Sequence, residues 1–282
     1  MESRNSKVCV ITGATSGIGR AATISLAQKG FKTLLVARSR EKGEAVQRFI
    51  RGISPDSSPE LFVGDLSSGQ SIHALAKEIR SVHPRIDVLI NNAGGVFGNR
   101  VLTPEGIEHT FALNHMGYFT LTNLLLDCLK SANGARIVNV SSQVHKFGKL
   151  DLSRLDADGE YNSMMAYAQS KLANLLFTYE LSRRLADTRI TVNALHPGGV
   201  RTNFGRDLPG AAGIFFRHFG FLLRSPEKGA ETLIWLAASD QVSGVTGKYF
   251  LDKREIRSSR SSYDTALAGR LWEISSELTG LA

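Results

Sequence analysis

The sequence predicts a single doubly wound α/β domain, in which a seven-stranded, mostly parallel sheet is flanked by helices on both faces. Short apolar runs alternate along the chain with longer segments of helical periodicity. Strands separated by helices in this way form right-handed crossovers between parallel strands. Several runs, such as residues 8–11, are apolar at every position, which is typical of strands covered on both faces.

The individual elements follow from this alternation. The expected strands are 7–12, 32–37, 61–65, 88–91, 136–141, 190–195 and 248–251. The expected helices lie near 17–29, 40–51, 69–82, 104–131, 163–187 and 226–238. The stretches 142–162, 198–225 and 252–262 show neither pattern and are expected to be loops. Because no repeat or linker divides the chain, residues 1–282 are assigned to one domain, with a substrate-covering loop at about 198–225 and a docking helix at about 263–279.

The composition is that of a globular protein, with 42% hydrophobic and 21% charged residues. A formal net charge of +8 favours anionic partners such as phosphates. The lysines and arginines are dispersed, however, so solvated surfaces are the favoured explanation of the charge. No lysine- or arginine-rich block or nucleic-acid-binding motif is found, and no nucleic-acid partner is expected.

The cysteines and the hydropathy pattern indicate whether the protein has disulfides, a metal site, a signal peptide or a membrane span. Cys9 and Cys128 form neither a disulfide framework nor a metal-ligand pattern, so we expect buried thiols and no metal site. The short polar start, 1–7, leads directly into the first strand and leaves no room for a signal peptide. The apolar patch 213–223 is interrupted by Arg217 and His218 and is shorter than the roughly 20 residues of a membrane span. We therefore expect a cytoplasmic location.

A glycine-rich turn joins the first strand to the first helix. In the motif TGATSGIG at 12–19, Gly13 permits a tight turn, and Gly17 and Gly19 allow the backbone to approach a diphosphate. The spacing GxxxGxG differs from the dinucleotide fingerprint GxGxxG, and a lone glycine pattern is weak evidence. The strand before it and the helix after it are what favour a nucleotide site.

The end of the second strand indicates which nucleotide binds there. An acidic residue about 20 residues beyond the glycines would bind the ribose 2′-hydroxyl of NAD. This chain instead has Ala37 and Arg38, where a guanidinium can form a forked contact with a 2′-phosphate. The sequence therefore favours NADP(H), with an ordinary surface arginine as the competing interpretation. Arg40 is a candidate to assist.

A tyrosine and a lysine open the helix expected at 163–187. Tyr167 and Lys171 are four residues apart and so share one face. An ammonium beside a phenol stabilises the phenolate and lowers a pKa that is ordinarily near 10. We therefore expect the pKa of Tyr167 to be lowered, so that it can exchange a proton with an alcohol or carbonyl oxygen.

Two further polar positions accompany this pair. Ser141 and Ser142 end the fifth strand, where a hydroxyl can donate to a substrate oxygen, although turn chemistry also explains serines there. Asn114 lies in a helix-forming stretch, where asparagine is disfavoured. Both positions are candidates for the site.

Together these motifs resemble the short-chain dehydrogenase/reductase family, whose fold is a Rossmann domain, over most of the chain. The motifs occur along the chain in the same order as in that family: TGATSGIG (12–19), Asp65-Leu66, Asn91-Asn92-Ala93-Gly94, Asn114, Val140-Ser141-Ser142, YAQSK (167–171) and His196-Pro197-Gly198. The segments LNHMGYF (113–119), RIVNVSSQVH (136–145) and KLANLLF (171–177) are similar to the retinol dehydrogenase-like subgroup. The resemblance implies an oxidoreductase that transfers a hydride between NADP(H) and a substrate carbon.

The resemblance also implies a role for each matched residue. Ser142, rather than its neighbour Ser141, polarises the carbonyl, Tyr167 transfers the proton, Lys171 holds the nicotinamide ribose, and Asn114 anchors a water molecule. The remaining cofactor-binding residues it implies are Gly13, Thr15, Ser16, Gly17, Ile18, Gly19, Arg38, Asp65, Leu66, Asn92, Ala93, Gly94, Pro197, Gly198, Val200 and Thr202. Within that set, Asp65 and Leu66 lie against the adenine. The segment from Pro197 to Thr202 meets the carboxamide of the nicotinamide.

The loop after the sixth strand carries the features that bear on the substrate. The loop 198–225 is rich in phenylalanine and leucine and carries arginines, which favours a lipophilic pocket or peripheral membrane contact through 213–223. Packing against the core or a partner subunit is the alternative. We expect a retinoid-like aldehyde, another aldehyde or a ketone as the substrate. The alternative substrates are a steroid, a polyketide-like ketone or a xenobiotic ketone. The alternative function is a non-catalytic, NADP(H)-sensing role. The resemblance also implies homodimers that form through 104–131 and 163–187.

Overall fold

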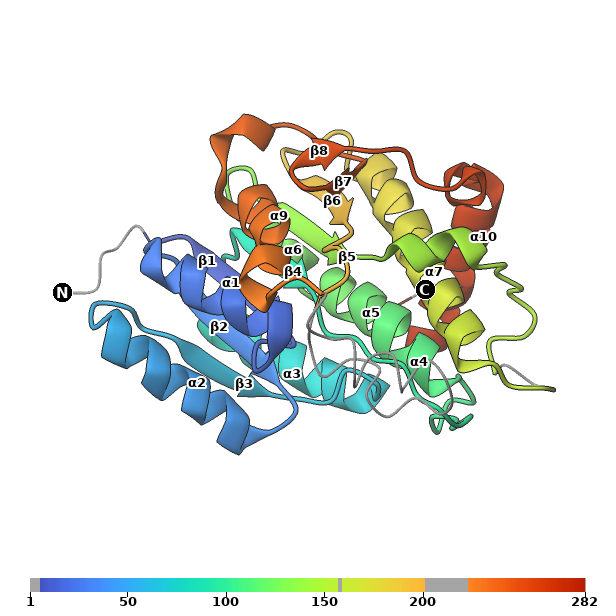
Figure 1. Cartoon of the computed structure of the whole chain (residues 1–282), viewed down its shortest axis with the longest axis horizontal. Helices are drawn as coiled ribbons and strands as arrows, with labels where there is room; N and C mark the ends of the chain where they lie inside the picture. The colour runs from blue at the N-terminus through green and yellow to red at the C-terminus, as the bar shows by residue number, and fades with distance from the viewer. Residues whose placement is uncertain (1–5, 157–158, 201–222, 282) are drawn as a thin grey trace.

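A computed structural model of the chain describes residues 6–156, 159–200 and 223–281. Its centre is a sheet of eight strands in the order β3-β2-β1-β4-β5-β6-β7-β8 (Figure 1). The strands are β1 (Val8–Thr12), β2 (Lys32–Ala37), β3 (Glu60–Val63), β4 (Val88–Asn91), β5 (Arg136–Val140), β6 (Thr191–Leu195), β7 (Lys248–Leu251) and β8 (Arg254–Glu255). All neighbouring pairs are parallel except β7 and β8. The order reverses between β1 and β4, which is the switch point where doubly wound sheets bind ligands.

The predicted fold class is confirmed, and one strand is added to it. Each of the seven predicted strands is found within two residues of its expected bounds. The eighth, β8, is a two-residue antiparallel partner of β7, and both of its residues are exposed. Such a short, charged edge strand has no hydrophobic alternation, so no sequence pattern predicts it.

Helices cover both faces of the sheet. The long helices are α1 (Gly17–Gln28), α2 (Arg40–Ile53), α3 (Gly69–Val82), α5 (Gly117–Leu124), α7 (Ser163–Arg184), α9 (Pro226–Ala238) and α10 (Thr265–Thr279). The shorter helical segments are α4 (His109–Phe111), η1 (Ala112–Met116), α6 (Leu126–Lys130), η2 (Gln143–Phe147), η4 (Asp240–Val242) and η5 (Arg260–Tyr263). One layer consists of α1, α2 and α9, and the other of α3, α5 and α7, against which α10 packs (Figure 1).

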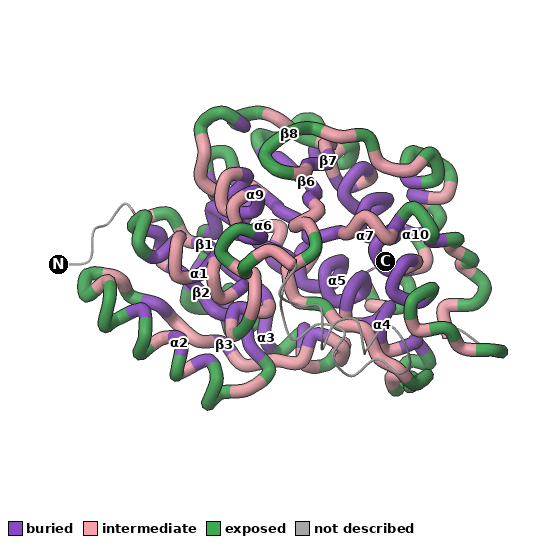
Figure 2. Tube along the Cα trace, in the orientation of Figure 1, coloured by how far each residue is buried: buried purple, intermediate pink, exposed green. Residues whose placement is uncertain are grey.

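Strand residues alternate between two cores, one under each helical layer. In β1, Cys9 and Ile11 pack under α1 and α9, whereas Val10 packs under α3 and α5. Burial on both sides explains why the strands are apolar at every position, and Figure 2 shows the central strands as buried along their length. Cys9 and Cys128 are free, buried thiols, as expected.

The helix predicted at 104–131 is wrong in its details. It begins at His109, because the preceding residues form a tight turn in which Leu102 pairs with Glu108 and Gly106 has a φ of 79°. It is then widened by a π turn, η1, at Ala112–Met116 and divided again at Leu125. π turns are rare and occur mostly at functional sites. Asn114, the residue whose helix propensity is poor, lies in this one.

Within the described ranges, no helix is long and apolar enough to cross a membrane. The tail helix α10 lies against α7, and its Trp272 contacts Phe119 and Phe177 at ring-centroid distances of 5.0 and 6.0 Å. Beside this aromatic cluster His115 is fully buried, with Nε2 3.3 Å from Ser275 Oγ of α10. Burial lowers the pKa of His115 from 6.5 to about 4, and the nearby Asn174 side chain opposes this shift only in part.

We expect His115 to make folding sensitive to mild acid. Its folded-state pKa lies below the ordinary 6.5, so the free energy of unfolding is at its full value above about pH 6.5 and falls as the pH approaches about 4. The loss from this group should be about 2 kcal/mol between about pH 7.5 and about pH 5. Urea unfolding at both pH values measures it. His115→Phe should show a pH difference smaller by that amount, and an unchanged pH difference would contradict the prediction.

Candidate active site

Three positions of the turn between β1 and α1 require glycine. Gly13 and Gly17 have φ of 66° and 50°, values that residues with side chains rarely adopt. A Cβ on Gly19 would lie 2.2 Å from the carbonyl oxygen of Gly13. The turn therefore requires glycine at all three positions and leaves its backbone open to a ligand.

The N-terminus of α1 is left uncapped by side chains. Its N-cap residue, Ser16, is exposed and makes no side-chain hydrogen bond to the helix. The other described helices of twelve or more residues are capped by the side chains of Ser39, Ser68, Asn162, Ser225 and Asp264. The amides around Thr15, Ser16 and Ile18 are thus available to an anion, which the helix dipole also favours. These features fit the diphosphate of a dinucleotide.

A set of hydrogen bonds holds this turn against the end of β4. The Thr12 hydroxyl accepts hydrogen bonds from the amides of Asn92 (2.8 Å) and Ala93 (3.0 Å). Asn92 Nδ2 in turn donates to the Thr12 carbonyl at 2.9 Å. Thr12 is therefore a positioning residue that no sequence pattern singled out, although it is the first residue of the glycine motif.

The residues predicted to hold the adenosine half lie after β2 and β3. Arg38 is exposed directly after β2. Burial acts to raise the pKa of Asp65, but hydrogen bonds from Ser67 and the positive charge of Arg38 outweigh it, and the net pKa is lowered. Leu66 is 4% exposed, within the core under α3 and α5. Arg38 and Asp65 are thus electrostatically coupled at one edge of the sheet.

The π turn brings Asn114 to the centre of the site. Asn114 Oδ1 accepts from the Gly95 amide (2.8 Å), and Nδ2 donates to the Gly95 carbonyl and to Ser170 Oγ (both 2.9 Å). A Cβ on Gly94 would lie 3.0 Å from Asn114 Oδ1 and 3.5 Å from Lys171 Nζ. Asn114 therefore braces the Gly94–Gly95 backbone, while its role toward water stays a prediction.

The predicted triad converges at the end of β5. Tyr167 and Lys171 share one face of α7 and are only 8% and 3% exposed. The Ser142 side chain lies near enough to the Tyr167 hydroxyl to act to lower its pKa. The adjacent Ser141 is turned away, because its buried hydroxyl donates to the carbonyl of Lys171 at 2.8 Å. Of the two serines, Ser142 is the one beside the phenol.

The pKa of Tyr167 is raised in the chain by itself, whereas the sequence predicted that it would be lowered. Burial raises the pKa of Tyr167, and the nearby Ser142 side chain only partly opposes it. Lys171 Nζ lies 5.6 Å from the tyrosine ring centroid and donates to the Val140 carbonyl at 3.0 Å. Burial also lowers the pKa of Lys171 to about 7. In the chain by itself, burial thus disfavours both the phenolate and the ammonium, and the net pKa of Tyr167 is raised.

The residues predicted for the nicotinamide end follow β6. Gly198 has a φ of 85°, and Val200 pairs with Arg224, so the two ends of the loop between them are held together. Val200 also packs tightly on α9, where a Cβ on Gly229 would lie 2.6 Å from its side chain. Pro197 lies between β6 and Gly198. Thr202 and the membrane-contact stretch 213–223, apart from its last residue, lie outside the described residues.

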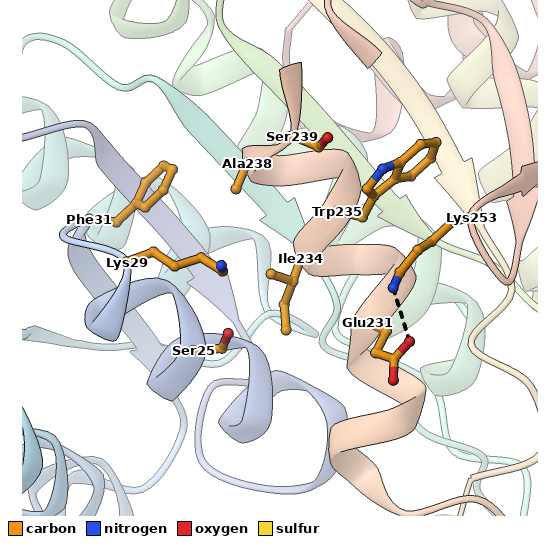
Figure 3. A pocket seen from close by; sticks show the side chains of 9 residues that line it. All are labelled: Ser25, Lys29, Phe31, Glu231, Ile234, Trp235, Ala238, Ser239 and Lys253. Carbon is orange, nitrogen blue, oxygen red and sulfur yellow. Dashed lines mark hydrogen bonds and ion pairs between the residues drawn. The ribbon is translucent and has the colours of Figure 1, made fainter. Parts of the chain in front are cut away.

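A separate pocket of about 560 Å³ lies between α1 and α9 (Figure 3). Its lining includes Lys29, Trp235 and the ion pair of Glu231 with Lys253 (3.1 Å). None of the predicted site residues lines it. Among the described residues no group of His, Cys, Asp or Glu side chains could hold a metal ion.

The parallel sheet with its glycine-rich turn, and the serine, tyrosine and lysine at the end of β5, define a nucleotide-dependent oxidoreductase. Residues 7–211 match the family model for short chain dehydrogenases. The chain is 41% identical to retinol dehydrogenase 14 of Mus musculus, over 98% of this chain and 86% of the mouse protein. The chain belongs to the short-chain dehydrogenase family and is an oxidoreductase acting on CH–OH groups.

Solved structures agree with this assignment. A Mycobacterium paratuberculosis protein superimposes with a TM-score of 0.79 at 32% identity, covering 99% of this chain and 96% of that protein. A short chain dehydrogenase of Shigella flexneri, solved in complex with NADP, gives a TM-score of 0.65 at 26% identity, covering 87% and 96%. The family uses NAD(H) or NADP(H).

Proposed function

We propose that this protein is an NADP(H)-dependent oxidoreductase that interconverts a carbonyl and an alcohol on a lipophilic small molecule such as a retinoid-like aldehyde. The observation that carries the proposal is that the Tyr167 and Ser142 side chains converge beside the buried Lys171, near enough for Ser142 to act on the pKa of Tyr167. Two hydroxyls placed side by side can both donate to one carbonyl oxygen. The residues that hold the cofactor are those of the glycine turn, Arg38 and the Asn92–Gly94 segment.

The chain's own residues account for the proton chemistry. Ser142 holds and polarises the carbonyl oxygen, and Tyr167 gives its proton to that oxygen as the alcohol forms. The phenol is protonated at neutral pH and can give its proton in the reduction, but because burial raises its pKa, the phenolate that it leaves behind must be stabilised. The bound nicotinamide supplies the hydride. The Tyr167 phenolate, which is the product of this proton transfer and the base of the reverse reaction, needs a positive charge nearby, and we assign that role to Lys171.

The cofactor and substrate preferences rest on different evidence. Arg38 is exposed directly after β2, where an NAD-binding chain would carry a carboxylate, and its guanidinium suits the 2′-phosphate of NADP(H). In addition, the Shigella flexneri relative was solved with NADP. The retinoid-like substrate is supported by the names of the relatives, which are retinol dehydrogenases. Membrane contact through 213–223 and pairing with a second copy of the chain stay predictions.

The test follows cofactor oxidation with retinal, a medium-chain aldehyde, a steroid ketone and an aromatic ketone. We expect turnover with NADPH, highest for the lipophilic aldehydes. In Arg38→Ala the Michaelis constant for NADPH should rise about 10- to 100-fold, because a charge-assisted contact is lost. The constant for NADH should change less than about threefold, since NADH has no 2′-phosphate.

Arg48→Ala is the matched control, because it removes the same charge from an exposed position of α2. It should leave both constants near their wild-type values. Equal changes for NADPH and NADH in Arg38→Ala would refute the 2′-phosphate contact. Absence of turnover with every carbonyl would refute the proposed reaction.

A further inference from the structure

A buried histidine lies three residues after Ser142. His145 belongs to η2 and has no exposed surface. Its ring packs edge-on against Tyr249, with centroids 5.3 Å apart and planes at 87°. The reaction described above does not use this side chain, although it is close to the hydroxyl pair.

Both ring nitrogens of His145 contact backbone groups. Nδ1 lies 2.6 Å from the carbonyl oxygen of Ser142, and the amide of Ser259 donates to Nε2 at 3.0 Å. A carbonyl oxygen only accepts and an amide N–H only donates. The two contacts together require a hydrogen on Nδ1 and a bare Nε2. An imidazolium could keep the first contact but not the second.

The groups around the ring also favour the uncharged form. Burial lowers the pKa of His145, the Ser142 contact acts in the opposite direction, and the positive charge of Lys146 lowers it again. His196, whose own pKa burial lowers to about 4, lies near enough to interact electrostatically with His145. Tyr249, packed against the ring, has its pKa raised by burial and stays a neutral phenol. None of these neighbours supplies a negative charge that would hold an imidazolium.

Ser259 lies in a segment that is fastened to the catalytic helix. We call residues 256–263 the tail strap. The Tyr179 hydroxyl of α7 is 2.7 Å from Ser258 Oγ, and the rings of Tyr179 and Tyr263 stack with centroids 5.1 Å apart. The strap is therefore a fixed anchor point for His145.

The other side of η2 is fixed as well. Gly148 lies so close to α7 that a Cβ there would be 2.6 Å from the carbonyl oxygen of Ala168, the residue after Tyr167. The loop that carries Ser142 is thus held between α7 and the tail strap. A small shift in its backbone would move the Ser142 hydroxyl relative to the phenol.

We propose that His145 is a positioning residue for Ser142: its Nδ1–H holds the Ser142 carbonyl and thereby directs the Ser142 hydroxyl toward Tyr167, while the Ser259 amide of the tail strap, by donating to Nε2, keeps the hydrogen on Nδ1. The inference rests on the proposed function, because the aim of Ser142 matters only if the hydroxyl pair binds a substrate oxygen. It assigns the tail strap, more than a hundred residues further along the chain, to the support of the active site.

Two substitutions separate the two contacts. In His145→Asn the side-chain amide nitrogen takes the place of Nδ1 and can still donate to Ser142. In His145→Gln the side-chain oxygen takes the place of Nε2 and can still accept from Ser259, but the Ser142 contact is lost. We expect kcat to stay within about threefold of wild type in the asparagine variant and to fall about 10- to 100-fold in the glutamine variant. The KM for NADPH should be unchanged in both.

A packing role alone makes the opposite prediction, since glutamine is closer to histidine in volume and should then be the better substitute. Equal losses in both variants, or a larger loss in the asparagine variant, would overturn the positioning role. Amide hydrogen exchange at Ser259 tests the anchor without turnover, because protection should persist in His145→Gln and fall in His145→Asn.

The wild-type protein gives a further measurement that needs no substitution. Nitrogen-15 spectra of the imidazole at neutral pH should show a protonated Nδ1 and a bare Nε2. A protonated Nε2 would overturn the inference. A wild-type enzyme without turnover would refute the proposed function and this role with it, whereas a normal wild type with equal losses in the variants would refute the role alone.

Discussion

Replacement of Tyr167 by phenylalanine is expected to lower kcat by about 10³-fold, the usual contribution of a positioned acid or base. The substitution removes only the hydroxyl, which lies beside the Ser142 side chain. The ring keeps its place on α7, where it is 8% exposed. The affinity for NADPH should therefore stay within about twofold of wild type. Steady-state reduction of a lipophilic aldehyde and fluorescence titration with NADPH measure the two quantities.

Tyr118→Phe is the control for this experiment. Tyr118 is also fully buried, and among the described residues its hydroxyl has no hydrogen-bond partner. Loss of that hydroxyl should leave kcat near the wild-type value. A Tyr167→Phe enzyme that binds NADPH normally and turns over as fast as wild type would show that another group transfers the proton.

The sheet could be predicted from the sequence because burial on both faces produces continuous apolar strands. Such runs, as at Cys9–Ile11 between the two cores, stand out from helical periodicity. The start of the helix at His109 could not be predicted in the same way, since the residues before it are ordered by the turn at Gly106. The strand β8 exists only because the chain turns back beside β7.

The site was predictable where its chemistry depends on local spacing. The four-residue spacing of Tyr167 and Lys171 places both on one helical face in any α-helix. The choice between Ser141 and Ser142 depends on which serine side chain faces the phenol, which only the packing of α7 on β5 decides. The direction of the Tyr167 pKa was mispredicted because spacing does not reveal burial. His145 was missed because its partner, Ser259, is remote in the sequence.

Gly19→Ala should have the second large effect, acting on both stability and cofactor affinity. The added Cβ would lie 2.2 Å from the Gly13 oxygen and 2.4 Å from Asn92 Nδ2, so α1 must move away from the turn. Overpacking of this kind typically costs about 1–3 kcal/mol of unfolding free energy. The shift also displaces the N-terminal amides of α1 from the anion they face. We expect NADPH affinity to fall by about 100-fold or more.

Gly269→Ala is the matched control, since that glycine lies inside α10 and a Cβ added to it would meet no described atom within 4 Å. It should be neutral or stabilising by up to about 1 kcal/mol, because alanine favours helices over glycine. Thermal unfolding with and without NADPH measures stability and binding together. In Gly19→Ala the melting temperature should be lower, and added NADPH should no longer raise it. A variant stabilised by NADPH as strongly as wild type would mean that the diphosphate is not held at this turn, and the cofactor would then have to bind at another edge of the sheet.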